Sequence, residues 1–123
     1  MITSRSPEGS FAVSGSHEDG TLVVRLVGEL DVATAPDVAE FVQLEVSAVQ
    51  PQHLVVDVAE VGFVDSSGLA ALLAVRRGVP DGVLVVRRAS PQLRRLLAIT
   101  GVGDVLVLEE DDPPPDLDGD GSA

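Results

Sequence analysis

The stretch LVVDVAEVGFVDSSGLAALLAV, Leu54–Val75, decides the fold. It begins as a run of apolar, mostly β-branched residues, which is typical of a strand buried on both faces. A short polar sequence, DSSG at residues 65–68, interrupts the run, and the leucines that follow it have helical spacing. The stretch therefore predicts a strand that enters a helix through a tight turn. Two serine hydroxyls lie at the start of that helix, at the edge of an α/β sheet where loops meet ligands and partners.

The same alternation of strands and helices is predicted along the rest of the chain. Strands are expected near residues 11–13, 21–28, 53–58, 82–87 and 105–108. Three helices are expected to begin near Pro36, Ser66 and Pro91, because proline suits the first turn of a helix and serine its N-cap. This order predicts a single α/β domain with a mostly parallel sheet of four or five strands. Crossover helices connect the strands, and the first strand is an antiparallel edge strand.

The ends of the chain differ in composition from this central domain. Residues 1–10 are polar and rich in serine and glycine, so a flexible N-terminal arm is expected there, before a domain over residues 11–108. Residues 109–123 combine seven acidic residues with three consecutive prolines, which predicts a disordered acidic tail.

Composition excludes several classes of function. The formal net charge is −12, and residues 1–108 alone carry thirteen acidic residues against eight arginines, a net charge of −5. Nucleic acids and anionic membranes prefer a basic face, so neither is an expected partner. The chain has no cysteine, no signal peptide and no membrane-spanning apolar run, so a cytoplasmic location is expected. It also has no lysine, which excludes Walker A phosphate binding and Schiff-base chemistry.

Enzymatic and metal-binding readings find little support in the residues. The turn DSSG does not match G-x-S-x-G, and both histidines, His17 and His53, precede the serines, whereas the α/β-hydrolase order places histidine last. Two histidines without cysteine make a poor zinc site. Asp57 ends an apolar strand, an arrangement also typical of a response-regulator receiver domain. The chemistry of receiver domains needs a lysine, and the chain has none, so this class is excluded. Glu29 and Asp31 are two residues apart and could be considered as a general acid–base pair. The sequence shows no facing group that would orient a substrate, so this role is not expected. No catalytic residue, cofactor or metal is therefore expected.

The turn itself has two interpretations. Asp and Ser are routine helix caps, and on the turn alone this structural role is favoured. The functional interpretation is that Ser66 or Ser67 accepts a phosphate, because a helix N-terminus tolerates an added anion. A phosphate adds a charge of about −1.5 to −2, which the neighbouring Asp65 opposes and the helix dipole partly accommodates.

Three motifs together resemble one family. GELDVATA at residues 28–35 resembles the signature G-E-L-D-x-x-T-A, and FVDSSGL at residues 63–69 resembles F-x-D-S-S-G-L. SPQLRRLL at residues 90–97, followed by Thr100-Gly101, resembles the late helix of the same family. In this order and spacing, over roughly Leu22 to Leu108, they resemble a STAS domain of the bacterial anti-sigma factor antagonist type.

The resemblance implies a partner-switching protein rather than an enzyme. The unphosphorylated form would bind an anti-sigma factor, a serine kinase of the GHKL type, and so free a sigma factor. The kinase would phosphorylate the first serine of the motif, Ser66, and a PP2C-like phosphatase would reverse this. A monomer or weak homodimer is expected. By the resemblance, the docking surface would comprise Asp31, Thr34, Asp65, Ser66, Ser67, Gly68 and Leu69.

The chain departs from the family pattern near its C-terminal end, and two alternative functions stay open. Members of the family usually finish with a helix that packs on the domain, whereas this chain has its acidic, proline-containing segment there. One alternative is a scaffold STAS protein of a stress-sensing complex, which would run as a very large particle on a sizing column. The other is a ligand-binding or enzymatic α/β domain, which would need a deep polar pocket.

Overall fold

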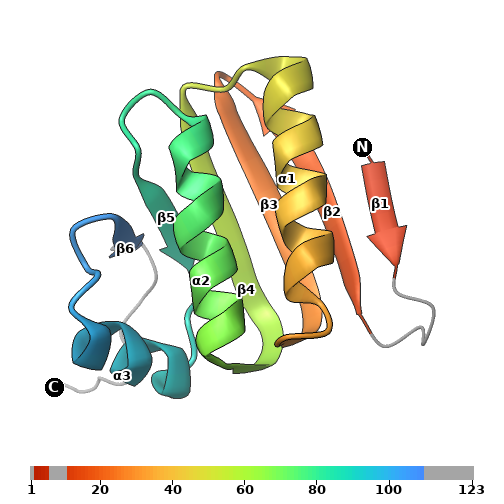
Figure 1. Cartoon of the computed structure of the whole chain (residues 1–123). Coiled ribbons are helices and arrows are strands. Elements are labelled where there is room, and N and C mark those ends of the chain that lie inside the picture. Colours follow the sequence, from red (N-terminus) through yellow and green to blue (C-terminus); the bar gives the residue numbers. More distant parts are fainter. Residues whose placement is uncertain (1, 6–10, 110–123) are drawn as a thin grey trace, which may run out of the picture.

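The computed structural model describes the backbone of residues 2–5 and the full residues 11–109. In these ranges the chain forms six strands, three α-helices and one 3₁₀ turn (Figure 1). The elements are β1 (Ile2–Arg5), β2 (Ala12–Glu18), β3 (Thr21–Leu30), α1 (Ala35–Val49), β4 (His53–Val64), α2 (Ser66–Val75), η1 (Arg76–Gly78), β5 (Leu84–Arg87), α3 (Pro91–Thr100) and β6 (Leu106–Leu108).

The six strands form one sheet in sequence order, β1-β2-β3-β4-β5-β6. Strand β2 is antiparallel to both of its neighbours, and the pairs from β3 to β6 are parallel. Five strands therefore point in one direction and only β2 opposes them. The predicted α/β class and mainly parallel sheet are confirmed.

The N-terminal strand differs from the expectation. Ile2–Arg5, which lie in the expected flexible arm, pair along β2, so the predicted antiparallel strand is internal and the sheet has six strands instead of four or five. Ile and Thr have high β-propensity, and the outer edge of β2 offers free backbone groups. The polar neighbours of this short segment hide that signal. Residues 6–10 of the expected arm and residues 110–123 of the expected tail lie outside the described residues.

Strand β4 is longer than predicted. It continues six residues past Val58 and ends at Val64, where it is still paired with the end of β3. The pairing passes through two register shifts, between Arg25 and Val27 and between Gly28 and Glu29. The strand consequently enters α2 with a single residue, Asp65, between them.

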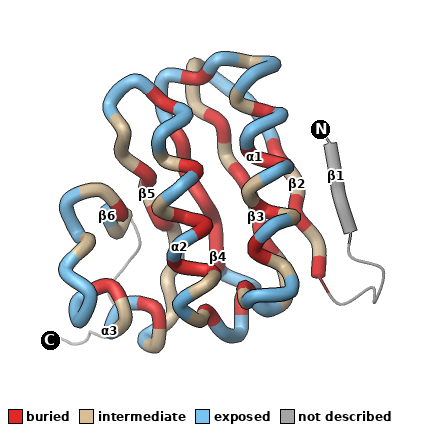
Figure 2. The backbone as a smooth tube through the Cα atoms, in the orientation of Figure 1, coloured by how far each residue is buried: buried red, intermediate tan, exposed pale blue. Residues whose placement is uncertain are grey.

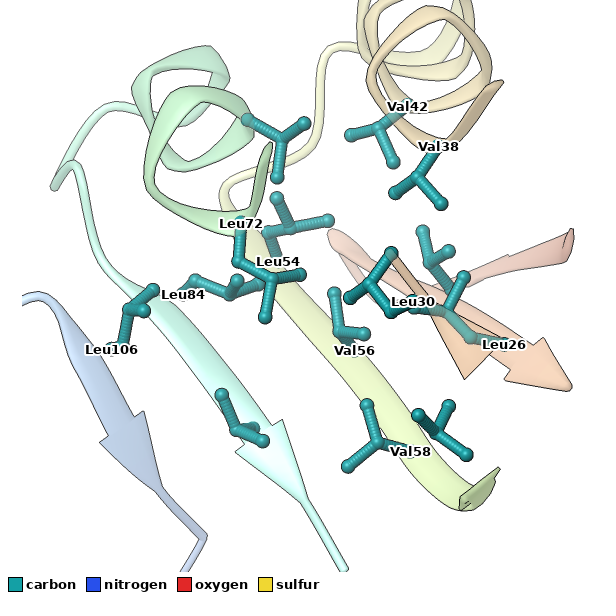
Figure 3. Packing of buried hydrophobic residues seen from close by; sticks show 14 of the residues in the cluster. Leu26, Leu30, Val38, Val42, Leu54, Val56, Val58, Leu72, Leu84 and Leu106 are labelled. Atoms are coloured by element: carbon teal, nitrogen blue, oxygen red, sulfur yellow. The ribbon is translucent and has the colours of Figure 1, made fainter. Parts of the chain in front are cut away.

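The hydrophobic core lies between the sheet and the helices α1 and α2, which cover the same face (Figures 1 and 2). Val38 and Val42 of α1 and Leu72 of α2 point toward this face of the sheet (Figure 3). They meet a layer of aliphatic strand residues with almost no exposed surface: Leu26, Leu30, Leu54, Val56 and Leu84. Burying each such side chain contributes about 1.5–3 kcal/mol to folding, so an aliphatic core suffices without tryptophan or tyrosine.

No helix in the described part of the chain combines the length and the apolar character that crossing a membrane requires. The helix α1 has 15 residues, whereas a transmembrane helix needs about 20.

Candidate functional site

The junction between β4 and α2 presents the predicted serine motif. Asp65 is the N-cap residue, and its carboxylate accepts a hydrogen bond of 2.9 Å from the backbone N–H of Gly68. Its carbonyl accepts the first helical hydrogen bond, from Leu69 N–H at 3.0 Å. Ser66 is the first residue of the helix and is exposed, whereas Ser67 is half-buried. No hydrogen bond joins the Ser66 hydroxyl to another described residue.

Glycine at position 68 is required by a close approach of two backbones. A Cβ atom added to Gly68 would lie 2.5 Å from the carbonyl oxygen of Leu30 and 2.6 Å from Leu30 Cγ. Real Cβ atoms do not come so close to backbone atoms, so any side chain here would push α2 away from β3. The glycine therefore keeps the start of α2 against the end of β3.

The junction between β3 and α1 is a turn closed by its own side chains. The Asp31 carboxylate accepts hydrogen bonds from the backbone N–H groups of Ala33 and Thr34, at 3.0 and 3.2 Å. The Thr34 hydroxyl donates to the carbonyl of Glu29 at 2.7 Å and accepts from Asp31 N–H at 3.0 Å. Asp31 and Thr34, both predicted site residues, thus determine the shape of this turn.

The two junctions are neighbours in space. Leu30 and Val64, the last residues of β3 and β4, are partners in the parallel register. The next residue, Asp65, donates its backbone N–H to the carbonyl of Leu30 at 3.1 Å. The structure thereby brings together the two turns that carry the predicted site residues. Within the second turn, Gly68 and Leu69 are buried and contribute to packing rather than to exposed surface.

Sequence reasoning did not single out two exposed apolar side chains of these motifs. Val32, in the turn after β3, is 70% exposed, and Phe63, near the end of β4, is 44% exposed. Phe63 is in register with Glu29. An apolar residue inside a polar turn, and an aromatic residue that alternates with the buried Val64, were the available signals. Together the two residues add apolar surface beside the polar junctions.

Gln92 was also missed. Its side-chain amide donates to the carbonyl of Val64 at 2.9 Å and accepts from Val64 N–H at 3.3 Å, as a neighbouring strand would. Ser90 caps the same helix by accepting from Leu93 N–H at 3.1 Å. The start of α3 therefore holds the last residue of β4, immediately before the serine motif. A glutamine two residues after a helix cap gives no such signal in the sequence.

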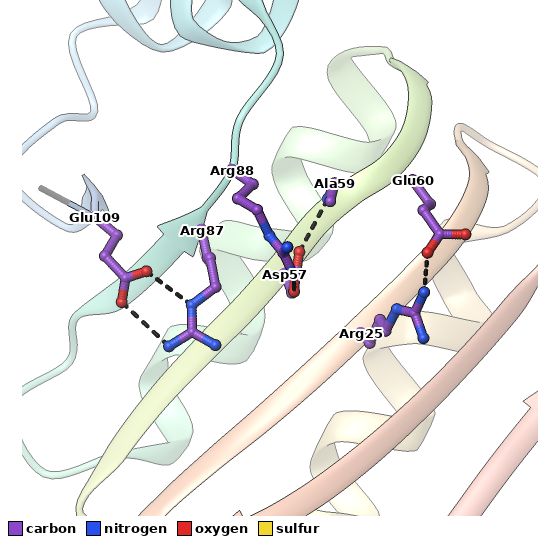
Figure 4. A network of polar contacts seen from close by, with 7 residues as sticks. All are labelled: Arg25, Asp57, Ala59, Glu60, Arg87, Arg88 and Glu109. Atoms are coloured by element: carbon purple, nitrogen blue, oxygen red, sulfur yellow. Dashed lines mark hydrogen bonds and ion pairs between the residues drawn. The ribbon is translucent and has the colours of Figure 1, made fainter. Parts of the chain in front are cut away.

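Asp57 lies on the sheet face opposite α1 and α2 (Figure 4). Its side chain is 6% exposed, forms an ion pair with Arg88 and accepts from Ala59 N–H at 3.0 Å. Burial acts to raise the pKa of Asp57, but the hydrogen bonds from Arg88 and Ala59 and the charges of Arg88 and Arg87 outweigh it. The pKa is held below its ordinary value, so this carboxylate is a structural anion.

The histidines lie far from the serine motif. His53 opens β4 and is in register with Thr21, the first residue of β3, whereas Ser66 lies beyond the opposite end of β4. His17 pairs with Leu22 and therefore also lies near the start of β3. With a rise of about 3.3 Å per residue, a strand of this length separates these groups by tens of ångströms. A serine–histidine pair is excluded for Ser66.

The local charge around Ser66 comes from the N-terminus of α2. The first turn of α2 contains no acidic residue, and its free N–H groups carry a partial positive charge that Asp65 meets at the cap. Within residues 2–5 and 11–109, no group of three or more histidine, aspartate or glutamate side chains gathers as a metal site would. The arrangement is suited to presenting a neutral hydroxyl and accommodating an anion in its place.

Comparisons with known proteins agree on one family. The model of the STAS domain matches residues 13–112. An anti-sigma F factor antagonist of Paenibacillus polymyxa is 30% identical over 105 residues, covering 84% of this chain and 90% of that protein. The crystal structure of an anti-sigma factor antagonist from Mycobacterium paratuberculosis has a TM-score of 0.72 and 29% identity, covering 86% of this chain and 90% of that one. Bacillus SpoIIAA in its phosphorylated form shares the fold, with a TM-score of 0.62 at 20% identity over 80% and 92% of the two chains.

Proposed function

Because the chain belongs to the STAS domain family, we propose that it acts as an anti-sigma factor antagonist controlled by phosphorylation of Ser66. In its unphosphorylated form it binds an anti-sigma factor, a serine kinase of the GHKL type, and the sigma factor is released. The kinase phosphorylates Ser66, which ends the binding, and a PP2C-like phosphatase removes the phosphate. The chain is then a substrate of enzymes rather than an enzyme, and acts in the cytoplasm with its partners.

The observation that carries this proposal is the exposed Ser66 hydroxyl on the first turn of α2. It has no hydrogen bond to another described residue, so a kinase meets it without first breaking a contact. Ser67 is half-buried and is the less accessible of the two hydroxyls. Geometry and family resemblance thus favour the same serine.

The proposed docking surface combines both junctions. Asp31, Thr34 and Asp65 fix the two turns through their hydrogen bonds. The exposed side chains of Val32 and Phe63 supply apolar contact area. The buried pair that follows the serines, Gly68 and Leu69, contributes indirectly by holding α2 against the sheet. A rigid edge of this kind loses little entropy when a partner binds.

The switch follows from a change of charge. The kinase transfers the γ-phosphoryl group of ATP to Ser66 Oγ, the hydroxyl loses its proton, and ADP leaves. The phosphate adds a charge of about −1.5 to −2 beside Asp65. Helix N–H groups stabilise this anion within the chain, so the fold survives. An interface that had accommodated a neutral serine now has to desolvate an anion, which costs several kcal/mol.

Phosphorylation-site mapping tests the assignment. The purified chain is incubated with ATP and the GHKL-type anti-sigma kinase encoded in the same genome, and the modified peptide is identified by mass spectrometry. We expect one phosphate, on Ser66, in the wild type and in the matched control Ser67→Ala, and none in Ser66→Ala. Stoichiometric modification of Ser66→Ala would show that Ser66 is not the acceptor.

A further inference from the structure

Strand β4 loses its strand partner on one side before it reaches the serine motif. Strand β5 pairs with β4 from Leu54 to Asp57 and then ends, and the chain continues into α3 (Figure 1). On the other side, β3 remains paired with β4 as far as Val64. In the described part of the chain, residues 58–64 of β4 therefore have a strand partner on the β3 side only.

Val64 is the residue at which the early end of β5 has consequences. It is buried, and buried backbone N–H and C=O groups need hydrogen-bond partners. The next residue, Asp65, donates its N–H toward β3, to the carbonyl of Leu30. The two backbone groups of Val64 are bonded instead by the side-chain amide of Gln92, at 2.9 Å and 3.3 Å. One side chain thus takes the place of the strand that has ended.

Gln92 is itself held in place by the start of α3. It is half-buried in the first turn of the helix, between the cap residue Ser90 and the buried Leu93. The Ser90 hydroxyl accepts a hydrogen bond from Leu93 N–H at 3.1 Å. Because the cap and the buried leucine fix this turn, the amide reaches Val64 from a fixed position. The end of β4 is therefore tied to α3 as well as to β3.

We propose that Gln92 is a positioning residue for Ser66, which holds the end of β4 so that the serine hydroxyl is presented to the kinase. Only Asp65 separates Val64 from Ser66, so a displacement of Val64 is passed directly to the first residue of α2. The inference rests on the proposed function, because the consequence it adds concerns phosphorylation.

The expected consequence follows from unpaired backbone groups. Without the amide of Gln92, two buried polar groups of Val64 have no partner, and the end of β4 moves to positions in which water reaches them. The junction that the kinase recognises is then populated for only a fraction of the time. A lower population of the recognised form raises the apparent KM of the chain as a substrate and leaves kcat unchanged.

The test compares two variants at the start of the same helix. Gln92→Met keeps the length of the side chain and removes both hydrogen bonds to Val64. The matched control, Ser90→Ala, removes the cap of α3 and leaves the amide of Gln92 in place. Both variants weaken α3, so a difference between them reports on the contact with Val64 rather than on the stability of the helix.

Amide hydrogen exchange, measured by NMR on the full chain, tests the contact without a kinase. In Gln92→Met we expect exchange about tenfold faster than in the wild type at Gly68 and Leu69, whose N–H groups are bonded to Asp65. In Ser90→Ala we expect exchange at these two amides to change by less than about threefold. Equal acceleration in both variants, or none in Gln92→Met, would overturn the proposal.

Phosphorylation kinetics with the GHKL-type anti-sigma kinase test the consequence. For Gln92→Met we expect KM to rise about fivefold, with kcat within about twofold of the wild type, and for Ser90→Ala we expect both constants to stay within about twofold. Equal KM values for wild type and Gln92→Met would sink this inference alone, whereas a wild type that is not modified on Ser66 would sink the proposed function. If Gln92→Met does not fold, Gln92→Glu replaces it in both experiments with the same expected directions, because a carboxylate accepts from Val64 N–H but cannot donate to its carbonyl.

Discussion

The two neighbouring strand-to-helix junctions connect similar elements in different ways. Between β3 and α1 the chain makes a four-residue turn whose polar side chains, Asp31 and Thr34, are satisfied within the turn. Between β4 and α2 there is a single residue, Asp65, and the first helical residue leaves its hydroxyl exposed. In the first junction the polar side chains bond within the turn, and in the second the Ser66 side chain is left exposed. The difference shows that two junctions of the same kind can either satisfy their polar groups within the turn or leave a hydroxyl exposed beside a capped helix start.

The largest expected effect comes from breaking the tight junction. Gly68→Ala places a methyl group 2.5 Å from the Leu30 carbonyl, so α2 has to shift, at a cost of about 1–3 kcal/mol or more in the free energy of unfolding. Chemical denaturation measures this loss. The matched control is Gly62→Ala on β4, because a Cβ there meets nothing within 4 Å, and it is expected to change stability by less than about 0.5 kcal/mol. Equal losses in both variants would contradict the role given to the close approach.

The next effect concerns Asp57. Its ion-pair partner, Arg88, lies in a third strand-to-helix junction, between β5 and α3. Asp57→Asn is expected to lower the free energy of unfolding by about 1.5–3 kcal/mol at neutral pH, because a buried charged hydrogen bond is lost. Urea denaturation measures the loss. The exposed pair partner Glu60 provides the control, and Glu60→Gln is expected to cost less than about 1 kcal/mol.

Acidification sharpens this prediction. The folded-state pKa of Asp57 is lowered below the ordinary value of 3.8, so the carboxylate contributes its full stabilisation above that pH. The contribution is lost as the pH falls through the folded-state pKa, because the proton then binds to the folded protein too. The gap in stability between wild type and Asp57→Asn should therefore narrow in denaturation experiments below pH 3.8. If the difference in stability between wild type and Asp57→Asn does not change with pH, the ionised Asp57 carboxylate is not the source of the stabilisation.

The smallest effect on the free energy of unfolding is expected at the junction between β3 and α1. Thr34→Val removes the hydroxyl that bridges Glu29 and Asp31 while keeping the shape of the side chain, and is expected to cost about 1 kcal/mol. Thr34→Ser keeps the hydroxyl and should retain most of that stability. If thermal unfolding ranks Thr34→Ser below Thr34→Val, the hydrogen bonds do not hold the turn.

Much of the fold could be predicted from the sequence because its signals are local. The β-branched run that becomes β4, the proline in the first turn of α1 and the serine that caps α3 each specify an element with their own residues. Strand β1 was missed because Ile2–Arg5 become a strand through pairing with β2, a non-local contact. The extension of β4 to Val64 was missed for the same reason, since its last residues depend on the end of β3.

The site could be predicted only in part. The motifs pointed to the two turns that form the proposed docking surface, and the parallel pairing of β3 and β4 brings those turns together. The hydrogen bonds of Gln92 to Val64, the approach of Leu30 to Gly68 and the exposure of Phe63 depend on distances between separate elements. A single sequence does not contain these distances.

Under the proposed function, one added charge on Ser66 decides partner binding without disturbing the fold. The most direct measurement is the affinity of the GHKL-type anti-sigma kinase for the unphosphorylated chain and for the chain phosphorylated on Ser66, by isothermal titration calorimetry, with thermal unfolding of both forms. We expect the phosphorylated form to bind about a hundredfold more weakly, with an unfolding temperature within a few degrees of the other form. Equal affinities for the two forms, or weaker binding that accompanies a large loss of stability, would contradict the account.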